Sequence, residues 1–213
     1  MADRNRMENI RTALWGSLEK WSPRLFLLGG GLILIFALHN GQVFLTDTTF
    51  KDWIYPTVIL GRLAVFLGIA GLSVRVVNRS PRFGKSGRMV VAVAVVSAIG
   101  LLVLGILAQI GVNTPIIAVF GIGTAVLTVI TYALFGVAII RTGAFSTLIG
   151  GLLLAAIVPI LIVFFGRFVL PVRLLGAISE SALFVIFVII GYALRTEFAP
   201  TDRAGPTGDT TIR

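Results

Sequence analysis

Fifty-two consecutive residues, Met89 to Ile140, contain no Asp, Glu, Lys, Arg or His. A helix at a water surface needs a polar face, so this stretch does not belong to a soluble domain. As one helix it would be about 78 Å long, more than twice the hydrocarbon core of a bilayer. Its one cluster of helix-breaking residues, Gly111 to Pro115, lies near the middle. The stretch therefore predicts a transmembrane hairpin.

The other apolar runs extend this hairpin to an all-α, polytopic membrane protein with a bundle of six transmembrane helices. The predicted spans are Ser22–Val43, Ile54–Val77, Met89–Ile110, Ile116–Ile140, Thr147–Phe165 and Leu174–Leu194. Four starts are marked by a proline, whose missing N–H is tolerated there: Pro23, Pro56, Pro115 and Pro171. Pro159 is interior to the fifth span, where it predicts a kink that frees the carbonyl of Ala155.

The flanking segments divide the chain into residues 1–21, the transmembrane domain 22–195 and a tail, 196–213. Apolar residues recur at helical spacing in the first segment, which predicts an amphipathic helix at the membrane interface: Met7, Ile10, Leu14, Leu18 and Trp21. A frayed N-terminal tail is the alternative. The first span has no small-residue cleavage site after it, so we expect it to be retained. The C-terminal tail is rich in Thr, Pro, Gly and Asp and is expected to be disordered.

The basic residues outside these spans are distributed very unequally between the two sides, fourteen against three. By the positive-inside rule the chain lies in the plasma membrane with both termini cytoplasmic. The net charge of +9 is explained by topology and by attraction to anionic headgroups, so we expect a lipid bilayer and not nucleic acid as the partner. Anionic-lipid contact is expected at the loop residues Arg79, Arg82, Lys85 and Arg88.

Two charged residues stand inside predicted spans at similar depth, Arg62 in the second and Glu180 in the sixth. Intramembrane charges are costly and are typical of functional or paired sites. Gly176 and Ala177 share the helix face of Glu180, so this face is expected to meet another helix. We therefore predict an Arg62–Glu180 ion pair, with Arg167 and Arg173 as rival partners for Glu180.

A weakly polar stripe runs along the fourth span at i+3 and i+4 spacing. It consists of Gly121, Thr124, Thr128 and Thr131, with Tyr132 beside them. Such a stripe lines a polar path in some proteins, but its hydroxyls more often bond to carbonyls of their own helix or to a neighbouring helix. Close small-residue spacings elsewhere predict tight helix contact, either within one chain, in a homo-oligomer or with a membrane partner subunit.

Catalytic chemistry has few candidates in this chain. There is no cysteine and a single histidine, and no nucleophile, metal or nucleotide motif is recognisable. We expect no catalytic residue, no metal, no cofactor and no enzyme activity.

The segment Tyr132–Pro159 contains Ala-Ile-Ile-Arg-Thr-Gly-Ala-Phe-Ser-Thr-Leu-Ile-Gly-Gly. It resembles loops between spans in small multi-spanning prokaryotic proteins of unknown function. The tail, with Arg195-Thr196-Glu197 and then Asp202-Arg203-Ala204-Gly205-Pro206, is similar to tails of uncharacterised membrane proteins from halophilic archaea. These resemblances imply a prokaryotic multi-spanning membrane protein and assign no functional residue.

Two functions are consistent with these patterns. The first, which is favoured by the short loops, the absence of catalytic motifs and the frequent small-residue spacings, is a non-catalytic accessory, assembly or sensing subunit of the membrane. The second is a small-molecule or ion transporter or channel that uses Arg62, Glu180 and the threonine stripe. A water-accessible cavity that reaches these residues would favour the second function, and a dry, closely packed interior the first.

Overall fold

The computed structural model describes residues 2–48, 54–110, 116–166 and 168–198, with side chains from residue 13 onward. In this part of the chain every regular element is an α-helix. The helices are α1 (Ala2–Thr46), α2 (Tyr55–Arg79), α3 (Pro81–Gln109), α4 (Ile116–Thr142), α5 (Thr147–Ala155), α6 (Ile157–Gly166) and α7 (Val172–Phe198). The turn at Gly111–Pro115 and the tail beyond Phe198 lie outside the described residues.

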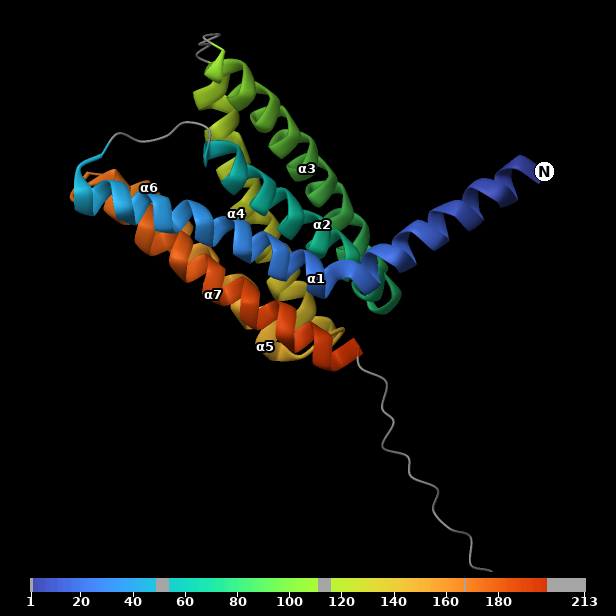
Figure 1. Cartoon of the computed structure of the whole chain (residues 1–213). Coiled ribbons are helices and arrows are strands. Elements are labelled where there is room, and N and C mark those ends of the chain that lie inside the picture. Colours follow the sequence, from blue (N-terminus) through green and yellow to red (C-terminus); the bar gives the residue numbers. More distant parts are fainter. Residues whose placement is uncertain (1, 49–53, 111–115, 167, 199–213) are drawn as a thin grey trace, which may run out of the picture.

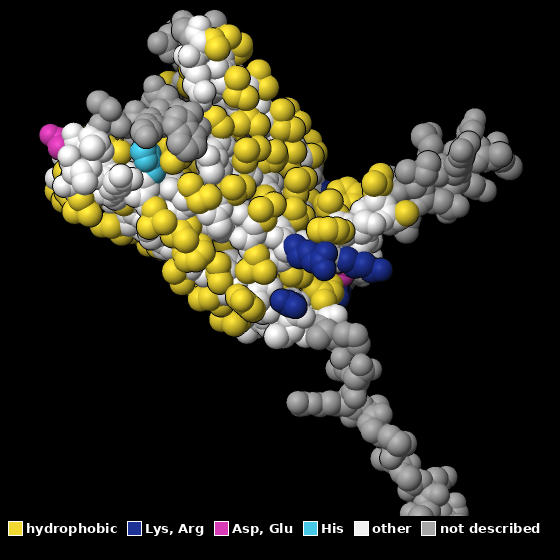
Figure 2. Space-filling model, viewed as in Figure 1, with side chains coloured by type: hydrophobic (Ala, Val, Ile, Leu, Met, Phe, Trp, Pro, Cys, Tyr) yellow, Lys and Arg dark blue, Asp and Glu magenta, His cyan; other side chains and the backbone are white. Residues whose placement is uncertain are grey.

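Six helical stretches are long and apolar enough to cross a membrane, with α5 and α6 together forming one of them. The predicted all-α six-helix bundle is therefore confirmed. Large apolar side chains cover much of the outer surface (Figure 2), as expected for a surface that faces lipid tails rather than water. Together these features indicate a multi-pass membrane protein.

The first helix differs from the prediction. The proposed boundary between an interfacial segment and a span at Ser22 is not a break, because α1 continues through Pro23. Pro23 is buried inside the helix instead of starting it. A proline there leaves the carbonyl of Glu19 without its helical N–H partner, and Figure 1 shows that α1 changes direction in this region, so that its N-terminal part projects from the bundle.

The connection between α2 and α3 is also shorter than predicted. The expected basic loop is a single residue, Ser80, because α2 extends to Arg79 and α3 begins at Pro81. Arg82, Lys85 and Arg88 therefore lie on the first turns of α3. A helix is able to continue through basic residues once it has left the hydrocarbon region. These basic residues therefore indicate the predicted membrane border and not the end of the helix.

The bundle is organised around α1, which packs along both α2 and α7 (Figure 1). Close approach depends on glycine at the crossing of α1 and α2, where a Cβ added to Gly29 would lie 2.7 Å from the carbonyl oxygen of Gly61. The crossing of α4 and α5 is equally tight at Gly136 and Gly150, where each added Cβ would meet the other's carbonyl oxygen. Small residues permit such approach where lipid provides no hydrophobic driving force.

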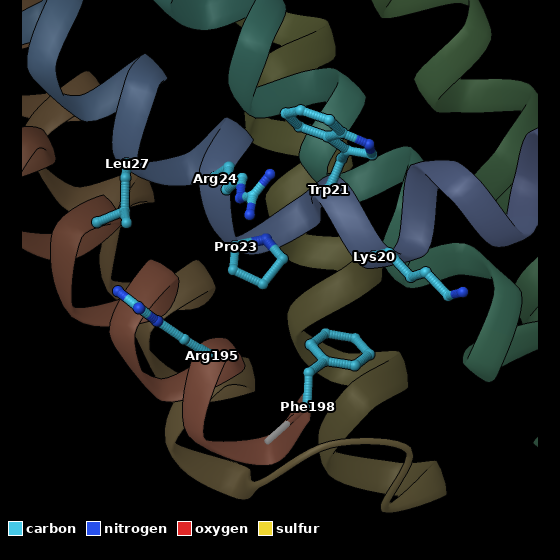
Figure 3. Close-up of a pocket in the computed structure, with 7 residues that line it drawn as sticks. All are labelled: Lys20, Trp21, Pro23, Arg24, Leu27, Arg195 and Phe198. Carbon is cyan, nitrogen blue, oxygen red and sulfur yellow. The ribbon is translucent and has the colours of Figure 1, made fainter. Parts of the chain in front are cut away.

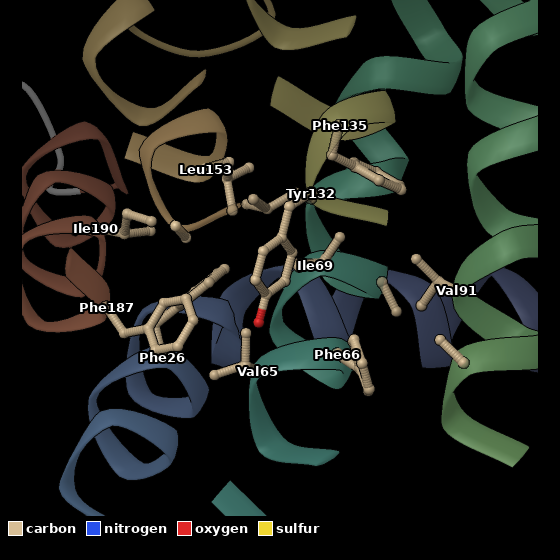
Figure 4. Packing of buried hydrophobic residues seen from close by; sticks show 14 of the residues in the cluster. Phe26, Val65, Phe66, Ile69, Val91, Tyr132, Phe135, Leu153, Phe187 and Ile190 are labelled. Atoms are coloured by element: carbon tan, nitrogen blue, oxygen red, sulfur yellow. The ribbon is translucent and has the colours of Figure 1, made fainter. Parts of the chain in front are cut away.

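The core is a layer of aromatic and branched side chains drawn from α1, α2, α3, α4, α5 and α7 (Figure 4). The rings of Phe26 and Phe187 lie 6.1 Å apart, and Tyr132 meets Phe187 edge-on at 5.9 Å. Phe66 completes this set and is fully buried. We refer to Phe26, Phe66, Tyr132 and Phe187 as the aromatic layer.

Candidate functional site

The predicted contact between Arg62 and Glu180 is present. Nη2 of Arg62, on α2, donates a hydrogen bond to Oε1 of Glu180, on α7, at 2.5 Å. The arginine side chain is 30% exposed and the glutamate side chain 7% exposed. The rival Arg173 is an exposed residue in the first turn of α7, and Arg167 lies outside the described residues. The acid is therefore the buried partner of an ion pair inside the bundle.

The packing of α7 on α1 places the glutamate. Gly176, one turn before Glu180, faces the Asn40 amide group of α1, and a Cβ added there would lie 3.6 Å from Asn40 Cγ. Asn40 donates from Nδ2 to the carbonyl oxygen of Phe36 at 3.1 Å. Since α2 and α7 pack mainly against α1, the long Arg62 side chain crosses the space between them to reach the carboxylate.

A cavity of about 240 Å³ lies beside this ion pair. Its lining comes from every helix except α5: Phe36, Asn40, Tyr55, Val58, Ile59, Arg62, Ala98, Leu101, Thr124, Val163, Val172, Gly176 and Glu180. The polar groups among them are an amide, a phenol, a guanidinium, a hydroxyl and a carboxylate. Apolar walls with a few convergent polar groups are typical of small-molecule sites.

One oxygen in this cavity has no hydrogen-bond partner among the described residues. Oε2 of Glu180 is buried and unsatisfied, although Oε1 is paired with Arg62. Buried polar atoms are nearly always bonded to protein, to water or to a ligand, because an unmade bond costs about 1–3 kcal/mol. This oxygen has almost no surface open to the cavity, so a donor in the cavity reaches it only when the carboxylate or a neighbouring side chain shifts.

The cavity and the aromatic layer occupy different levels of the same helices. On α2 the cavity is lined from Tyr55 to Arg62, whereas Phe66 lies one turn further toward the basic end. On α7 the lining runs from Val172 to Glu180, and Phe187 follows two turns later. Tyr55 and Val172 are exposed at the helix starts. The cavity therefore has its rim at the end that carries few basic residues, and the aromatic layer closes the other side.

No family model, curated protein or solved structure matches this chain.

The threonine stripe divides between packing and the cavity. Thr124 lines the cavity, donates to the carbonyl oxygen of Phe120 at 2.8 Å and shares a 2.8 Å hydrogen bond with the Ser97 hydroxyl of α3. Thr128 donates to the carbonyl oxygen of Thr124 at 2.7 Å, and Thr131 Oγ1 is buried without a partner in the described part of the chain. Tyr132 belongs to the aromatic layer. Only Thr124 therefore brings the stripe to the ion pair.

Pro159 interrupts the fifth span as predicted. Helix α5 ends at Ala155 and α6 begins at Ile157, so the break lies one turn before the proline. Pro159 itself is buried, and Val163, one turn later, reaches the cavity wall. The interrupted helix therefore contributes to the wall of the Glu180 cavity through Val163.

The four residues expected to contact anionic lipid have different environments. Arg79 donates to the carbonyl oxygens of Thr142, the last residue of α4, and of Gly143, which follows it. Arg88 donates from Nε to the Ser73 hydroxyl at 3.0 Å and lies over the Trp15 ring at 4.5 Å. Both therefore bind within the protein, whereas Arg82 and Lys85 are exposed on α3.

Sequence reasoning missed Asn40 and Tyr55 as residues of the site. Asn40 looked like the polar end of the first span, yet α1 continues to Thr46 and buries it. Its spacing of four residues from Phe36 was the available signal. Tyr55 stands at the start of the second predicted span, and nothing in the local sequence distinguishes a cavity rim from an ordinary span start there.

Metal binding has no support in the described residues, where no three His, Asp or Glu side chains gather at one place. His39 lies in the last turns of α1 and Asp47 directly follows that helix, and Asp52 is outside the described residues.

Proposed function

We propose that this protein is a transporter of small polar solutes, with the Arg62–Glu180 cavity as its solute site. The observation that carries the proposal is a cavity among the apolar helices that is lined by a buried ion pair, whose carboxylate has one oxygen without a hydrogen-bond partner in the described residues. A dry, closely packed interior at this position would have favoured an accessory subunit. No described side chain donates a hydrogen bond to Oε2 of Glu180. A donor group of a solute, or water, is therefore the natural partner of this oxygen.

The cavity chemistry indicates the class of solute. The guanidinium and carboxylate cancel in charge, and Arg62 is partly exposed, so it retains N–H donors beyond the one that binds Glu180. A solute with an anionic end for Arg62 and a cationic or donor end for Glu180 satisfies both. The volume of about 240 Å³ is below the range of about 300–1,000 Å³ for drug-sized ligands. The proposed solute is therefore a small zwitterion with an ammonium group, such as glycine.

An access route in one direction is also consistent with transport. The cavity rim is at one end of the helices and the aromatic layer lies on the other side, as an outward-open state of alternating access requires. The break before Pro159 divides the helix that contributes Val163 to the cavity wall. A helix that is already interrupted can bend at that point with no further loss of backbone hydrogen bonds.

The orientation belongs to the proposal. We place all six helical stretches across the plasma membrane with both termini in the cytoplasm. The side that holds the termini carries fourteen Lys and Arg residues outside the predicted spans, and the opposite side carries three. The cavity then opens outward. A reporter enzyme fused after Arg213 is expected to be active only in the cytoplasm, and activity outside the cell would overturn this orientation.

Water access to the cavity is testable because the chain has no cysteine. In proteoliposomes, Thr124→Cys is expected to react with a membrane-impermeant methanethiosulfonate reagent that is added at the cavity side. Thr128→Cys is the matched control, because it is as buried as Thr124 and lies one turn further along the same face but does not line the cavity. Equal protection of both cysteines would show that the reagent does not reach position 124 through the cavity, and this would contradict the proposal.

Transport is tested with radiolabelled glycine, betaine and glycerol in the same vesicles. We expect uptake of glycine above the level of protein-free vesicles and above that of betaine, whose quaternary nitrogen has no N–H. This uptake is expected to be lost in Glu180→Gln and retained in Glu19→Gln. Glu19 is the matched control because it is paired with Arg75, away from the cavity. Uptake of none of the three, with Thr124→Cys accessible, would contradict the proposed solute class.

A further inference from the structure

A second cavity, of about 470 Å³, lies between α1 and α7 at the basic end of the bundle (Figure 3). It is lined by Lys20, Trp21, Pro23, Arg24, Leu27, Arg195 and Phe198. None of these residues lines the Glu180 cavity. We refer to this site as the α1–α7 groove.

The groove is positively charged and has no acidic residue in its lining. Lys20, Arg24 and Arg195 are all exposed. Neither ion pair in the described part of the chain involves them, because Glu19 is bonded to Arg75 and Glu180 to Arg62. Arg24 lies over the ring of Trp21 at 4.7 Å, a contact that leaves its charge uncompensated. An anion is therefore the complementary ligand.

The floor of the groove is apolar. Pro23 is buried, and Leu27 and Phe198 are half-buried on either side of it. Figure 3 shows the three cationic side chains directed away from one another around Pro23. A free phosphate ion is held best by donors that converge on one point. A ligand with an extended polar head and an apolar body fits separated cations around an apolar floor better.

The position along the helices matches the depth of lipid headgroups. Arg24 stands near the start of the apolar part of α1, and Arg195 is in the last turn of α7. Trp21 is exposed beside them, and tryptophan is enriched at the level of the headgroups. Figure 2 shows Lys and Arg side chains gathered on this end of the molecule.

We propose that the α1–α7 groove binds one anionic phospholipid. Its polar head extends across the separated cations Arg24, Arg195 and Lys20, and its glycerol and first acyl carbons cover Pro23, Leu27 and Phe198. This site is separate from Arg82 and Lys85, which are exposed on α3 and line neither of these cavities. Their attraction to a bilayer is diffuse, whereas the groove holds one lipid between two helices.

The test measures lipid binding to the full chain in neutral detergent by native mass spectrometry. Phosphatidylglycerol is expected to remain bound where phosphatidylcholine does not. Each basic residue near an anionic headgroup contributes about 1 kcal/mol, equivalent to about fivefold in affinity. Arg24→Gln/Arg195→Gln is therefore expected to lose about 25-fold. The matched control, Arg82→Gln/Lys85→Gln, removes the same charge from the same end and is expected to stay within about twofold.

Three outcomes would overturn the proposal. Unchanged phosphatidylglycerol binding in Arg24→Gln/Arg195→Gln would remove the groove as the site. Equal losses in both double variants would indicate diffuse attraction to basic residues. Competition by millimolar inorganic phosphate would indicate a phosphate site in place of a lipid site. All four substituted residues are exposed, and unchanged elution on size exclusion checks that each variant is folded.

Discussion

The Arg62–Glu180 ion pair is expected to show strong energetic coupling in a double-mutant cycle. The perturbations are Arg62→Gln, Glu180→Gln and both together, because glutamine keeps most of the volume and removes the charge. Removing one partner of a buried pair costs about 3–5 kcal/mol, since the other charge is left uncompensated. The contact is 2.5 Å and the acid is 7% exposed, but Arg62 is 30% exposed. We therefore expect the low end of this range, about 3 kcal/mol for each single variant.

The double variant is expected to lose about 3–4 kcal/mol of the free energy of unfolding, well below the sum of about 6 kcal/mol. No charge is then left without a partner. The resulting coupling of about 2–3 kcal/mol lies in the upper part of the range for residues in direct contact. Reversible unfolding in mixed SDS and neutral-detergent micelles, followed by the fluorescence of the three tryptophans, measures each value.

The ion pair between Glu19 and Arg75 provides the internal control. Its contact is 2.6 Å, but its side chains are 18% and 35% exposed, and exposed pairs couple by about 0.2–1 kcal/mol. The same cycle on this pair is expected to stay below about 1 kcal/mol. A coupling below about 0.5 kcal/mol for Arg62 and Glu180 would refute the reasoning, because it would mean that water in the cavity screens the pair as fully as a protein surface does.

Three further predictions follow from the packing. Gly136→Ala places a Cβ 2.9 Å from a carbonyl oxygen of α5 and is expected to cost about 1–3 kcal/mol in the same unfolding assay. Its control is Gly121→Ala, whose added Cβ meets nothing within 4 Å. This control is expected to change the free energy of unfolding by less than about 1 kcal/mol. Pro159→Ala supplies the N–H that the carbonyl of Ala155 lacks, so hydrogen exchange of the amides at 156–160 is expected to slow; unchanged exchange would mean that packing and not the proline breaks the helix. Glu197 accepts a 2.8 Å hydrogen bond from the backbone N–H of Ser146, at the start of α5, and Glu197→Ala is expected to cost about 0.5–2 kcal/mol; no loss would make that cap redundant.

The six helical stretches were predictable because the bilayer imposes their length. About twenty apolar residues are needed to span the hydrocarbon core, and nothing in water produces such runs. The Arg62–Glu180 contact was predictable for a related reason, since an intramembrane charge without a counter-ion is costly and few partners were available at the same depth. Both inferences rest on what lipid excludes, and both hold in the structure.

The helix ends and the cavity were not predictable in the same way. Outside the hydrocarbon region a helix is free to continue, so Arg82 and Lys85 lie on α3 and not in a loop. The cavity depends on space that six helices leave unfilled, and periodicity along one helix does not encode it. Thr124 and Thr128 share one stripe and one kind of backbone hydrogen bond, yet only Thr124 reaches that space.

The two proposed sites share α1 and α7, and this has a mechanical consequence. Opening the Glu180 cavity toward the basic end requires Phe26 and Phe187 to separate, and their rings are now 6.1 Å apart. These residues belong to the same two helices that line the α1–α7 groove. A lipid that holds α1 against α7 therefore resists that separation. Phosphatidylglycerol is expected to slow zwitterion uptake relative to phosphatidylcholine, and Arg24→Gln to remove the difference while labelling of Thr124→Cys from the open side stays the same.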